Sequence, residues 1–216
     1  MEVFIIIVIS YVVGSVPTSI IIARKVAGID IREHGSGNAG MSNVMRVIGL
    51  HTGIFVGVVD VMKGWLTTAW LPIFIIGNGD VTDITLLRIA AGGAAVLGHT
   101  YTIFARFRGG KGIATLAGLM TALYPGAVLI CLVMFSVTFG IWGYVSLSSM
   151  TAAVTLPLSV VLLPSAGLSP APQPLAIFSL VVPLFVFFTH RDNIARLRKG
   201  NEKRFDKALM LGRNAD

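Results

Sequence analysis

The stretch VFIIIVISYVVGSVPTSIIIA, residues 3–23, is an almost uninterrupted run of apolar side chains. A helix that crosses a bilayer needs about 20 such residues, so this run is long enough to span a membrane. It is too long for the apolar core of a secretory signal peptide, it ends at Arg24-Lys25, and further apolar segments follow it. We therefore expect it to be retained as the first membrane helix.

The composition of the whole chain agrees with this interpretation. Of its 216 residues, 55% are hydrophobic and only 12% are charged, and the mean hydropathy is +0.83. Because ordinary soluble domains carry about 25% charged residues, these values favour an all-α, polytopic membrane protein. A net charge of +7 would suggest nucleic acid as the partner of a soluble protein. In a membrane protein, basic cytoplasmic loops and anionic phospholipid explain it, so no nucleic-acid partner is expected.

The remaining apolar segments predict the number of crossings. The block 113–147 is broken by Tyr124-Pro125-Gly126, which indicates two short spans joined by a tight turn. Seven transmembrane helices result, or five if this block crosses once or re-enters the membrane. Since no internal repeat is visible, we expect a single domain over residues 1–216. The other apolar segments are 53–76, 86–104, 150–165 and 175–189, with a proline-rich linker at 164–174 before the last.

The loop charges predict the orientation of the helices. Segments 24–46, 105–112 and 191–213 are basic, whereas 77–85 carries only acidic charges. Because basic loops stay on the cytoplasmic side, the N-terminus is expected outside and the C-terminus in the cytoplasm, which requires an odd number of crossings. Residues 191–216 are then a short basic cytoplasmic tail.

The first of three polar motifs is HGSGNAGMSNVMR at 34–46, on the predicted cytoplasmic side. Its glycines let backbone N–H groups approach an anion, Ser and Asn add donors, and the planar guanidinium of Arg46 suits phosphate. The motif also matches the dinucleotide pattern G-x-G-x-x-G literally. Since it follows a membrane helix rather than a strand, we interpret it as a phosphate loop without a nucleotide-binding fold.

The second motif is GHTYTIFARFRGGKGIAT at 98–115, in which three glycines frame Lys111 just before a predicted helix start. Free N–H groups at a helix N-terminus and a nearby ammonium group favour an anion. The alternative is a flexible turn with one snorkelling lysine. The motif is not a P-loop, because Ala105 occupies the first glycine position of that pattern and Gly112 its hydroxyl position.

The third motif is HRDNIARLRKGNE at 190–202, immediately after the last span. Its His190, Asn193 and either Arg196 or Leu197 would share one helix face. Taken alone, it would be a basic helix end that anchors to anionic headgroups. Because all three motifs fall on the same predicted side of the membrane, they can converge on one site.

Some polar residues and glycines lie inside the apolar segments. Asp60 and Lys63 stand three residues apart within a span, where a structural ion pair is a simpler role than substrate contact. The pairs Gly53/Gly57 and Gly92/Gly93 favour close packing of helices.

The cysteine and the histidines give no sign of a metal or a thiol site. Cys131 is the single cysteine and lies in apolar sequence, so neither a disulfide within the chain nor a reactive thiolate is expected. His34, His51, His99 and His190 do not stand at metal-ligand spacings. We expect no metal and no cofactor.

The three motifs, with Gly14-Ser15-Val16-Pro17 and Asp60-Val61-Met62-Lys63-Gly64, resemble those of the bacterial acyl-phosphate-dependent glycerol-3-phosphate acyltransferases, the PlsY family. The likeness covers nearly the whole chain, with the family patterns GSGN-x-G-x-TN-x-x-R, GH-x-x-P…GGKG-x-AT and H-x-x-NI-x-RL-x-x-G-x-E in order. Ser42 stands where the family usually has Thr, which keeps the hydroxyl. Thr102 stands where it usually has Pro, which removes a rigid turn residue before Arg106.

The resemblance implies a seven-helix bundle that transfers a fatty acyl group from acyl phosphate to the 1-hydroxyl of glycerol 3-phosphate, giving lysophosphatidic acid and phosphate. It implies a location in the bacterial inner membrane, with the active site on the cytoplasmic face, and we expect a monomer. Lys111 and Arg46 would bind phosphate, Ser36 would help to cradle it, and His190 and Asn193 would orient glycerol phosphate or the acyl carbonyl. Further substrate-binding positions are Gly35, Gly37, Asn38, Gly40, Ser42, Asn43, His99, Gly109, Gly110, Gly112 and Arg196.

The chemistry of the donor favours direct transfer. Acyl phosphate is a mixed anhydride with a good leaving group, so no covalent acyl-enzyme is required, and neither Ser36 nor Ser42 has a nucleophile-elbow context. We expect the glycerol hydroxyl to attack directly, with catalysis by positioning and charge stabilisation. Its proton could pass to His190 or to the substrate's own phosphate. No histidine has an Asp five positions on, which disfavours a thioester donor.

Two other classes of protein remain as alternatives. An organophosphate transporter would also place Gly, Ser and Arg among broken membrane helices, but its site would lie near the midplane between repeats. A membrane scaffold without activity would leave three ordered polar motifs unexplained.

Overall fold

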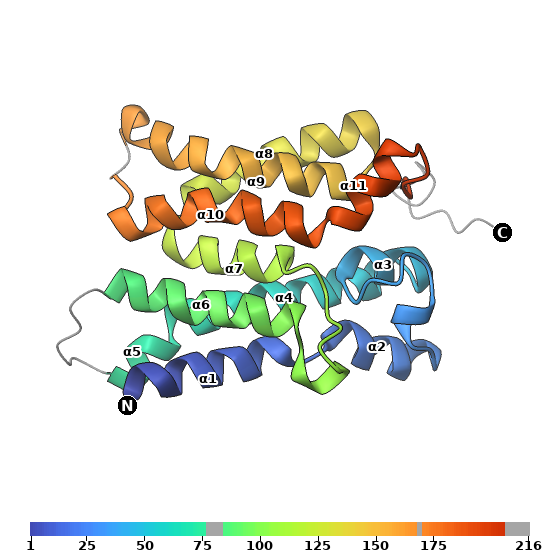
Figure 1. Cartoon of the computed structure of the whole chain (residues 1–216), viewed down its shortest axis with the longest axis horizontal. Helices are drawn as coiled ribbons and strands as arrows, with labels where there is room; N and C mark the ends of the chain where they lie inside the picture. Colours follow the sequence, from blue (N-terminus) through green and yellow to red (C-terminus); the bar gives the residue numbers. More distant parts are fainter. Residues whose placement is uncertain (77–83, 168–169, 206–216) are drawn as a thin grey trace. The chain divides into compact units, whose positions relative to one another are not determined.

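The computed structural model describes residues 1–76, 84–167 and 170–205. Every regular element in these ranges is a helix, as predicted. The chain divides into two compact units, a first unit at Met1–Pro125 and a second unit at Gly126–Asp216 (Figure 1). The single domain over residues 1–216 stays a prediction, and residues 77–83 of the predicted acidic loop and Lys207 of the tail lie outside the described residues.

The first apolar run forms two helices, α1 at Glu2–Ser15 and α2 at Thr18–Ala27. Val16, with φ −56° and ψ 112°, leaves the helical region. The cause is Pro17, which restricts the residue before it and has no N–H to continue the ladder. The run predicted as the first membrane helix is thus broken at Pro17, while α1 and α2 together are long and apolar enough for one span.

The break leaves two backbone carbonyls that need partners, and side chains from later elements supply them. The Thr102 hydroxyl donates to the Ser15 carbonyl, and the Lys63 ammonium donates to the Val16 carbonyl at 2.5 Å. An interrupted helix in a membrane protein is tolerated where neighbouring side chains satisfy the freed groups. These two bonds therefore hold the break in place.

Glycines set the close packing of the first unit. Helix α4 at Leu50–Ala69 packs against α7 at Ile113–Leu123. A Cβ added at Gly64 would lie 1.9 Å from the Thr115 carbonyl oxygen, and one added at Gly118 would lie 2.0 Å from a backbone oxygen of α4. Only glycine allows the two backbones to approach this closely.

The predicted packing glycines behave differently from one another. Gly53 and Gly57 lie against methionine side chains of α3 at Met41–Val47, and Gly92 lies against side chains of two neighbouring helices. A Cβ added at Gly93 would meet nothing within 4 Å, so the prediction of close packing is wrong for this residue. The other elements of the first unit are Ile31–Glu33 (η1), Leu71–Ile76 (α5), Ile84–Thr100 (α6) and Ile103–Ala105 (η2).

The described part of the second unit contains four α-helices. The predicted break near Tyr124 is confirmed, since α7 ends at Leu123 and a new helix starts at Pro125. The last two helices meet at a bend of 61°, where α11 begins directly after His190. The elements of this unit are Pro125–Trp142 (α8), Val145–Leu162 (α9), Leu163–Ala166 (η3), Gln173–Thr189 (α10) and Arg191–Arg198 (α11).

Three helical stretches among the described residues are long and apolar enough to cross a membrane. They are Glu2–Ala27, Pro125–Trp142 and Val145–Ser165, and the bent pair α10 and α11 would make a fourth. Helix α4 carries the buried charges of Asp60 and Lys63, and the other remaining helices of the first unit are shorter. The seven crossings and the orientation of the termini therefore stay predictions.

Candidate functional site

The first polar motif is held together by the side chain of Asn43. Its Oδ1 accepts the Ser36 backbone N–H at 2.7 Å, and its Nδ2 donates to the carbonyls of Ile31 at 3.0 Å and His34 at 2.9 Å. Asn43 is buried, with 1% of its surface exposed. The predicted binding residue Asn43 thus fixes the loop backbone, and Ser36 and Asn38 stay half-exposed on that loop.

The glycines of this loop take conformations that side chains rarely adopt. Gly35 has φ +61° and Gly37 has φ +74°. A Cβ added at Gly35 would also lie 2.2 Å from the Asn43 Oδ1. The loop therefore needs glycine for its turn and for the approach of Asn43, as well as for any approach to an anion.

An arginine that the sequence reading did not single out ties this loop to the second motif. The guanidinium of Arg32 donates to Asp30 Oδ2 at 2.6 Å and to Asp30 Oδ1 at 3.0 Å, and it also reaches the Ala105 carbonyl at 3.0 Å. The hydrogen bonds from Arg32 hold the pKa of Asp30 below its ordinary value of 3.8. The spacing Asp-x-Arg ahead of the glycine loop was the available signal.

The second motif folds back onto the end of α6. The N–H of Gly109 donates to the Thr100 carbonyl and that of Gly110 to the His99 carbonyl, both at 3.1 Å. A Cβ added at Gly109 would lie 2.0 Å from the His99 carbonyl oxygen, so only glycine fits. Gly112, with φ +80°, is the N-cap of α7, which confirms the predicted helix start. Lys111 therefore lies immediately before a helix N-terminus, half-buried.

The loop between α6 and Gly109 is strained at two positions. Arg106 has φ +56° and Phe107 has φ +59°, both in the left-handed region. This is the loop in which Thr102 replaces the family's usual Pro, and the Thr102 hydroxyl bonds the Ser15 carbonyl. Such backbone strain persists only where surrounding contacts determine the loop shape.

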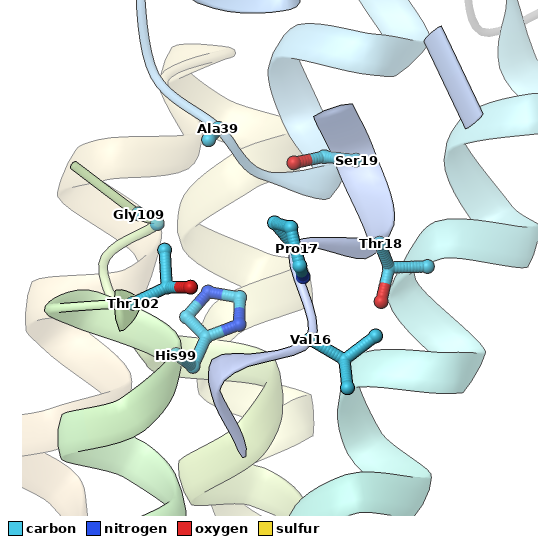
Figure 2. A pocket seen from close by; sticks show the side chains of 9 residues that line it. Val16, Pro17, Thr18, Ser19, Ala39, His99, Thr102 and Gly109 are labelled. Atoms are coloured by element: carbon cyan, nitrogen blue, oxygen red, sulfur yellow. The ribbon is translucent and has the colours of Figure 1, made fainter. Parts of the chain in front are cut away.

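A small cavity lies where the first two motifs meet the break between α1 and α2 (Figure 2). Its volume is about 10 Å³, room for about one water molecule. The His99 ring lies beside Thr102 and faces Pro17, with Gly109 on the side of Thr102 and Ala39 farther from the ring (Figure 2). The lining residues are Val16, Pro17, Thr18, Ser19, Ala39, His99, Thr102, Gly109 and Gly110.

A larger groove of about 370 Å³ shares Val16 and Pro17 with this cavity. Most of the residues that line the groove are apolar, and two arginines are the charged residues in its lining. The residues that line it are Val16, Pro17, Ile20, Ile21, Arg24, Arg32, Phe104 and Ala105. The first unit therefore presents a small pocket with some polar side chains next to a larger, mostly apolar groove.

Asp60 and Lys63 form the predicted ion pair, with 2.8 Å between Lys63 Nζ and Asp60 Oδ1. The same carboxylate oxygen lies 3.6 Å from Nδ1 of His99. All three side chains are at least nine-tenths buried. The pair is thus part of a buried triad that reaches the cavity through His99.

The second unit holds the third motif around Glu202. This carboxylate accepts Asn193 Nδ2 at 2.6 Å, Arg196 Nε at 2.7 Å and the Ser146 hydroxyl at 2.7 Å. Burial raises the pKa of Glu202, but the three hydrogen bonds outweigh it and the pKa is lowered from 4.5. The sequence reading placed Asn193 and Arg196 on one face but gave no role to Glu202, although the motif includes it.

His190 caps the bend at the start of α11 and is 3% exposed. Its Nδ1 lies 2.8 Å from the Val186 carbonyl oxygen. A carbonyl only accepts, so Nδ1 carries the proton and Nε2 keeps its lone pair in the neutral ring. His190 can therefore accept a proton or a hydrogen bond through Nε2.

The structure brings the first two motifs together in the first unit and orders the third within the second unit. Arg46 lies in the last turn of α3, half-buried. Among the described residues, no group of three His, Cys, Asp or Glu side chains could hold a metal ion.

Comparisons with known proteins agree on one family. Residues 4–200 match the model of the glycerol-3-phosphate acyltransferase family. A glycerol-3-phosphate acyltransferase of Geotalea daltonii is 41% identical over 92% of this chain and 95% of its own, and one of Chlorobium luteolum is 37% identical over 97% of both.

Two crystal structures share the fold. The glycerol 3-phosphate form of PlsY (YgiH), an integral membrane glycerol 3-phosphate acyltransferase, superimposes with a TM-score of 0.82 at 32% identity, over 98% of this chain and 99% of that one. The lysophosphatidic acid form of PlsY (YgiH) gives a TM-score of 0.80 at the same identity and coverage.

Proposed function

This chain belongs to the glycerol-3-phosphate acyltransferase family, and we propose that it transfers a fatty acyl group from acyl phosphate to the 1-hydroxyl of sn-glycerol 3-phosphate. The products are lysophosphatidic acid and inorganic phosphate. The observation that carries this proposal is the folding of the GGKG loop onto the end of α6 beside the first polar motif. That arrangement puts Lys111 directly before the N-terminus of α7, and an ammonium group beside the first N–H groups of a helix favours a phosphate.

The proposed roles of the cationic residues follow from this arrangement. Lys111 places an ammonium group at the N-terminus of α7, where the first N–H groups of the helix have no partner within it. Arg46 contributes a planar guanidinium from α3, and Ser36 a hydroxyl from the loop that Asn43 holds. Both substrates carry phosphate, so a cationic pocket at the membrane surface suits both.

We propose that the transfer is direct. The oxygen of the 1-hydroxyl attacks the acyl carbonyl carbon, the bond from that carbon to the phosphate oxygen breaks, and phosphate leaves with the bonding electrons. The hydroxyl proton passes to Nε2 of His190 or to a phosphate oxygen of the substrate. Asn193, held by Glu202, orients glycerol phosphate or the acyl carbonyl. The mixed anhydride is reactive enough that positioning and charge stabilisation suffice.

The proposed setting is the cytoplasmic face of the bacterial inner membrane, with a monomer of seven transmembrane helices, the N-terminus outside and the C-terminus in the cytoplasm. The basic segments of the chain support this orientation. The apolar groove beside Pro17 supports a substrate that carries an acyl chain.

The donor is tested with purified protein, palmitoyl phosphate and labelled glycerol 3-phosphate, with palmitoyl-CoA as the control donor. We expect labelled lysophosphatidic acid only with the acyl phosphate. Product from palmitoyl-CoA alone would overturn the assignment of the donor.

The residue roles are tested with three variants. Lys111→Ala and Arg46→Ala should each lose most of the activity while the helices stay folded, and full activity in either variant would remove that residue from the site. A His190→Ala variant that keeps most of its rate would leave the substrate phosphate as the base.

A further inference from the structure

Asp60 is a buried carboxylate with two different partners. In α4 it is 2% exposed, and its Oδ1 lies 2.8 Å from Lys63 Nζ and 3.6 Å from His99 Nδ1. Lys63 also donates to the Val16 carbonyl at the break between α1 and α2. Asp60 therefore lies between a cation that holds the helix break and an imidazole that lines the cavity.

His99 is in turn the residue against which the glycine loop rests. Its carbonyl accepts the Gly110 N–H at 3.1 Å, and a Cβ added at Gly110 would lie 2.2 Å from its Nε2. The ring and the loop are thus in close contact on the side opposite Asp60. The ring thus packs directly against Gly110, the residue before Lys111.

We propose that Asp60 is a positioning residue for the phosphate site, because it fixes the His99 ring that supports Gly110 next to Lys111. Asp60 Oδ1 lies 3.6 Å from His99 Nδ1, and because a carboxylate only accepts, it favours the ring with a proton on Nδ1. This role rests on the proposed function, in which the GGKG loop and Lys111 bind phosphate.

A purely structural role for the Asp60–Lys63 ion pair predicts a different effect of substitution. A buried ion pair can often be replaced by neutral groups of similar volume without loss of stability. If Asp60 only neutralised Lys63, any neutral replacement of both partners would serve equally well. If Asp60 acts through His99, the replacement must keep an acceptor for Nδ1–H.

Two matched double variants separate these possibilities. Asp60→Asn/Lys63→Met removes both charges but keeps an Oδ1 acceptor at the same place, whereas Asp60→Ala/Lys63→Met removes both charges and the acceptor. Melting temperature and the separate KM values for glycerol 3-phosphate and acyl phosphate are measured in detergent for both.

We expect the Asn variant to keep the KM for glycerol 3-phosphate within about threefold of the wild type. The Ala variant should raise it by about tenfold or more, because the His99 ring then loses the acceptor that faces Nδ1, and losing a buried polar partner costs on the order of tenfold. Equal KM values in the two double variants would overturn the positioning role. If the Ala variant does not fold, His99→Phe tests the same contact between Asp60 and His99, because phenylalanine keeps a flat ring but has no N–H that faces Asp60. A wild-type KM in His99→Phe would overturn the positioning role.

Lys111→Ala is measured in parallel to keep the two proposals distinct. A wild-type KM for glycerol 3-phosphate in Lys111→Ala would overturn the phosphate site and the positioning role with it. Equal values in the two double variants, with Lys111→Ala impaired, would overturn the positioning role alone.

Discussion

Gly110 offers a test of how tightly the glycine loop must fit. Its φ is not in the left-handed region, so the cost of replacing it by alanine is steric. The added Cβ would lie 2.2 Å from His99 Nε2 and 2.9 Å from the Ala39 carbonyl oxygen. An ordinary contact begins near 3.4 Å, so the ring and the loop must separate by about 1.2 Å (3.4 minus 2.2).

Because a displacement of about 1 Å in a positioned site can cost about 100-fold in rate, we expect Gly110→Ala to lower kcat/KM by about 100-fold. This corresponds to about 2.7 kcal/mol of transition-state stabilisation. The assay is the formation of labelled lysophosphatidic acid from acyl phosphate and glycerol 3-phosphate, with the melting temperature recorded beside it.

Gly93→Ala is the matched control, since a Cβ at Gly93 in α6 would meet nothing within 4 Å. It should keep activity within about twofold and should not lower the melting temperature, because alanine favours a helix over glycine by about 1 kcal/mol. Wild-type kcat/KM in Gly110→Ala, or an equal loss in Gly93→Ala, would refute the reasoning from the close contact.

Three further predictions concern the loops and the third motif. Asn43→Ala should destabilise the fold by about 2 kcal/mol and raise the KM for glycerol 3-phosphate. The reason is that the backbone groups bonded to the Asn43 amide, including the Ser36 N–H, lose their partner. An unchanged melting temperature and KM would contradict this. Arg32→Lys should lower the free energy of unfolding, measured with denaturant, by about 1 kcal/mol. The reason is that lysine lacks the planar guanidinium that binds both Asp30 and the Ala105 carbonyl. Equal stability would count against this connection between Asp30 and Ala105. Since the pKa of Glu202 is lowered in the folded state, its stabilisation is present above its ordinary value of 4.5 and is lost as the pH falls through the folded-state pKa. The melting temperature should therefore fall as the pH is lowered below 4.5, and by less in Glu202→Gln, whereas equal falls in both proteins would contradict this.

The sequence predicted the helical class of the fold. It predicted the start of a helix most successfully where the residues beside that start carry a local signal. The start of α7 after Gly112 and the break at Tyr124 follow from glycine and proline chemistry within a few residues. The break at Pro17 carries the same kind of signal, but the apolar residues on both sides of it suggested one continuous span. Apolar length indicates a membrane segment without showing whether its helix is interrupted.

The contacts that order the candidate site were harder to predict, because they join residues far apart in the chain. The bond from Arg32 to the Ala105 carbonyl and the approach of His99 to Asp60 depend on how α4, α6 and the first loop pack. The bonds of the Asn43 amide to the loop backbone were not predicted either, and its contact with substrate stays a prediction. Motif spacing identified the loop, but not the contacts that its side chains make within the fold.

The most direct measurement of single-step transfer is a rapid-quench experiment with carbonyl-labelled palmitoyl phosphate. With glycerol 3-phosphate present, label should appear in lysophosphatidic acid in step with phosphate release, and none should remain on the denatured protein. With glycerol 3-phosphate omitted, no burst of phosphate is expected. A burst of phosphate, or label bound to the protein, would contradict direct transfer from acyl phosphate to the glycerol hydroxyl.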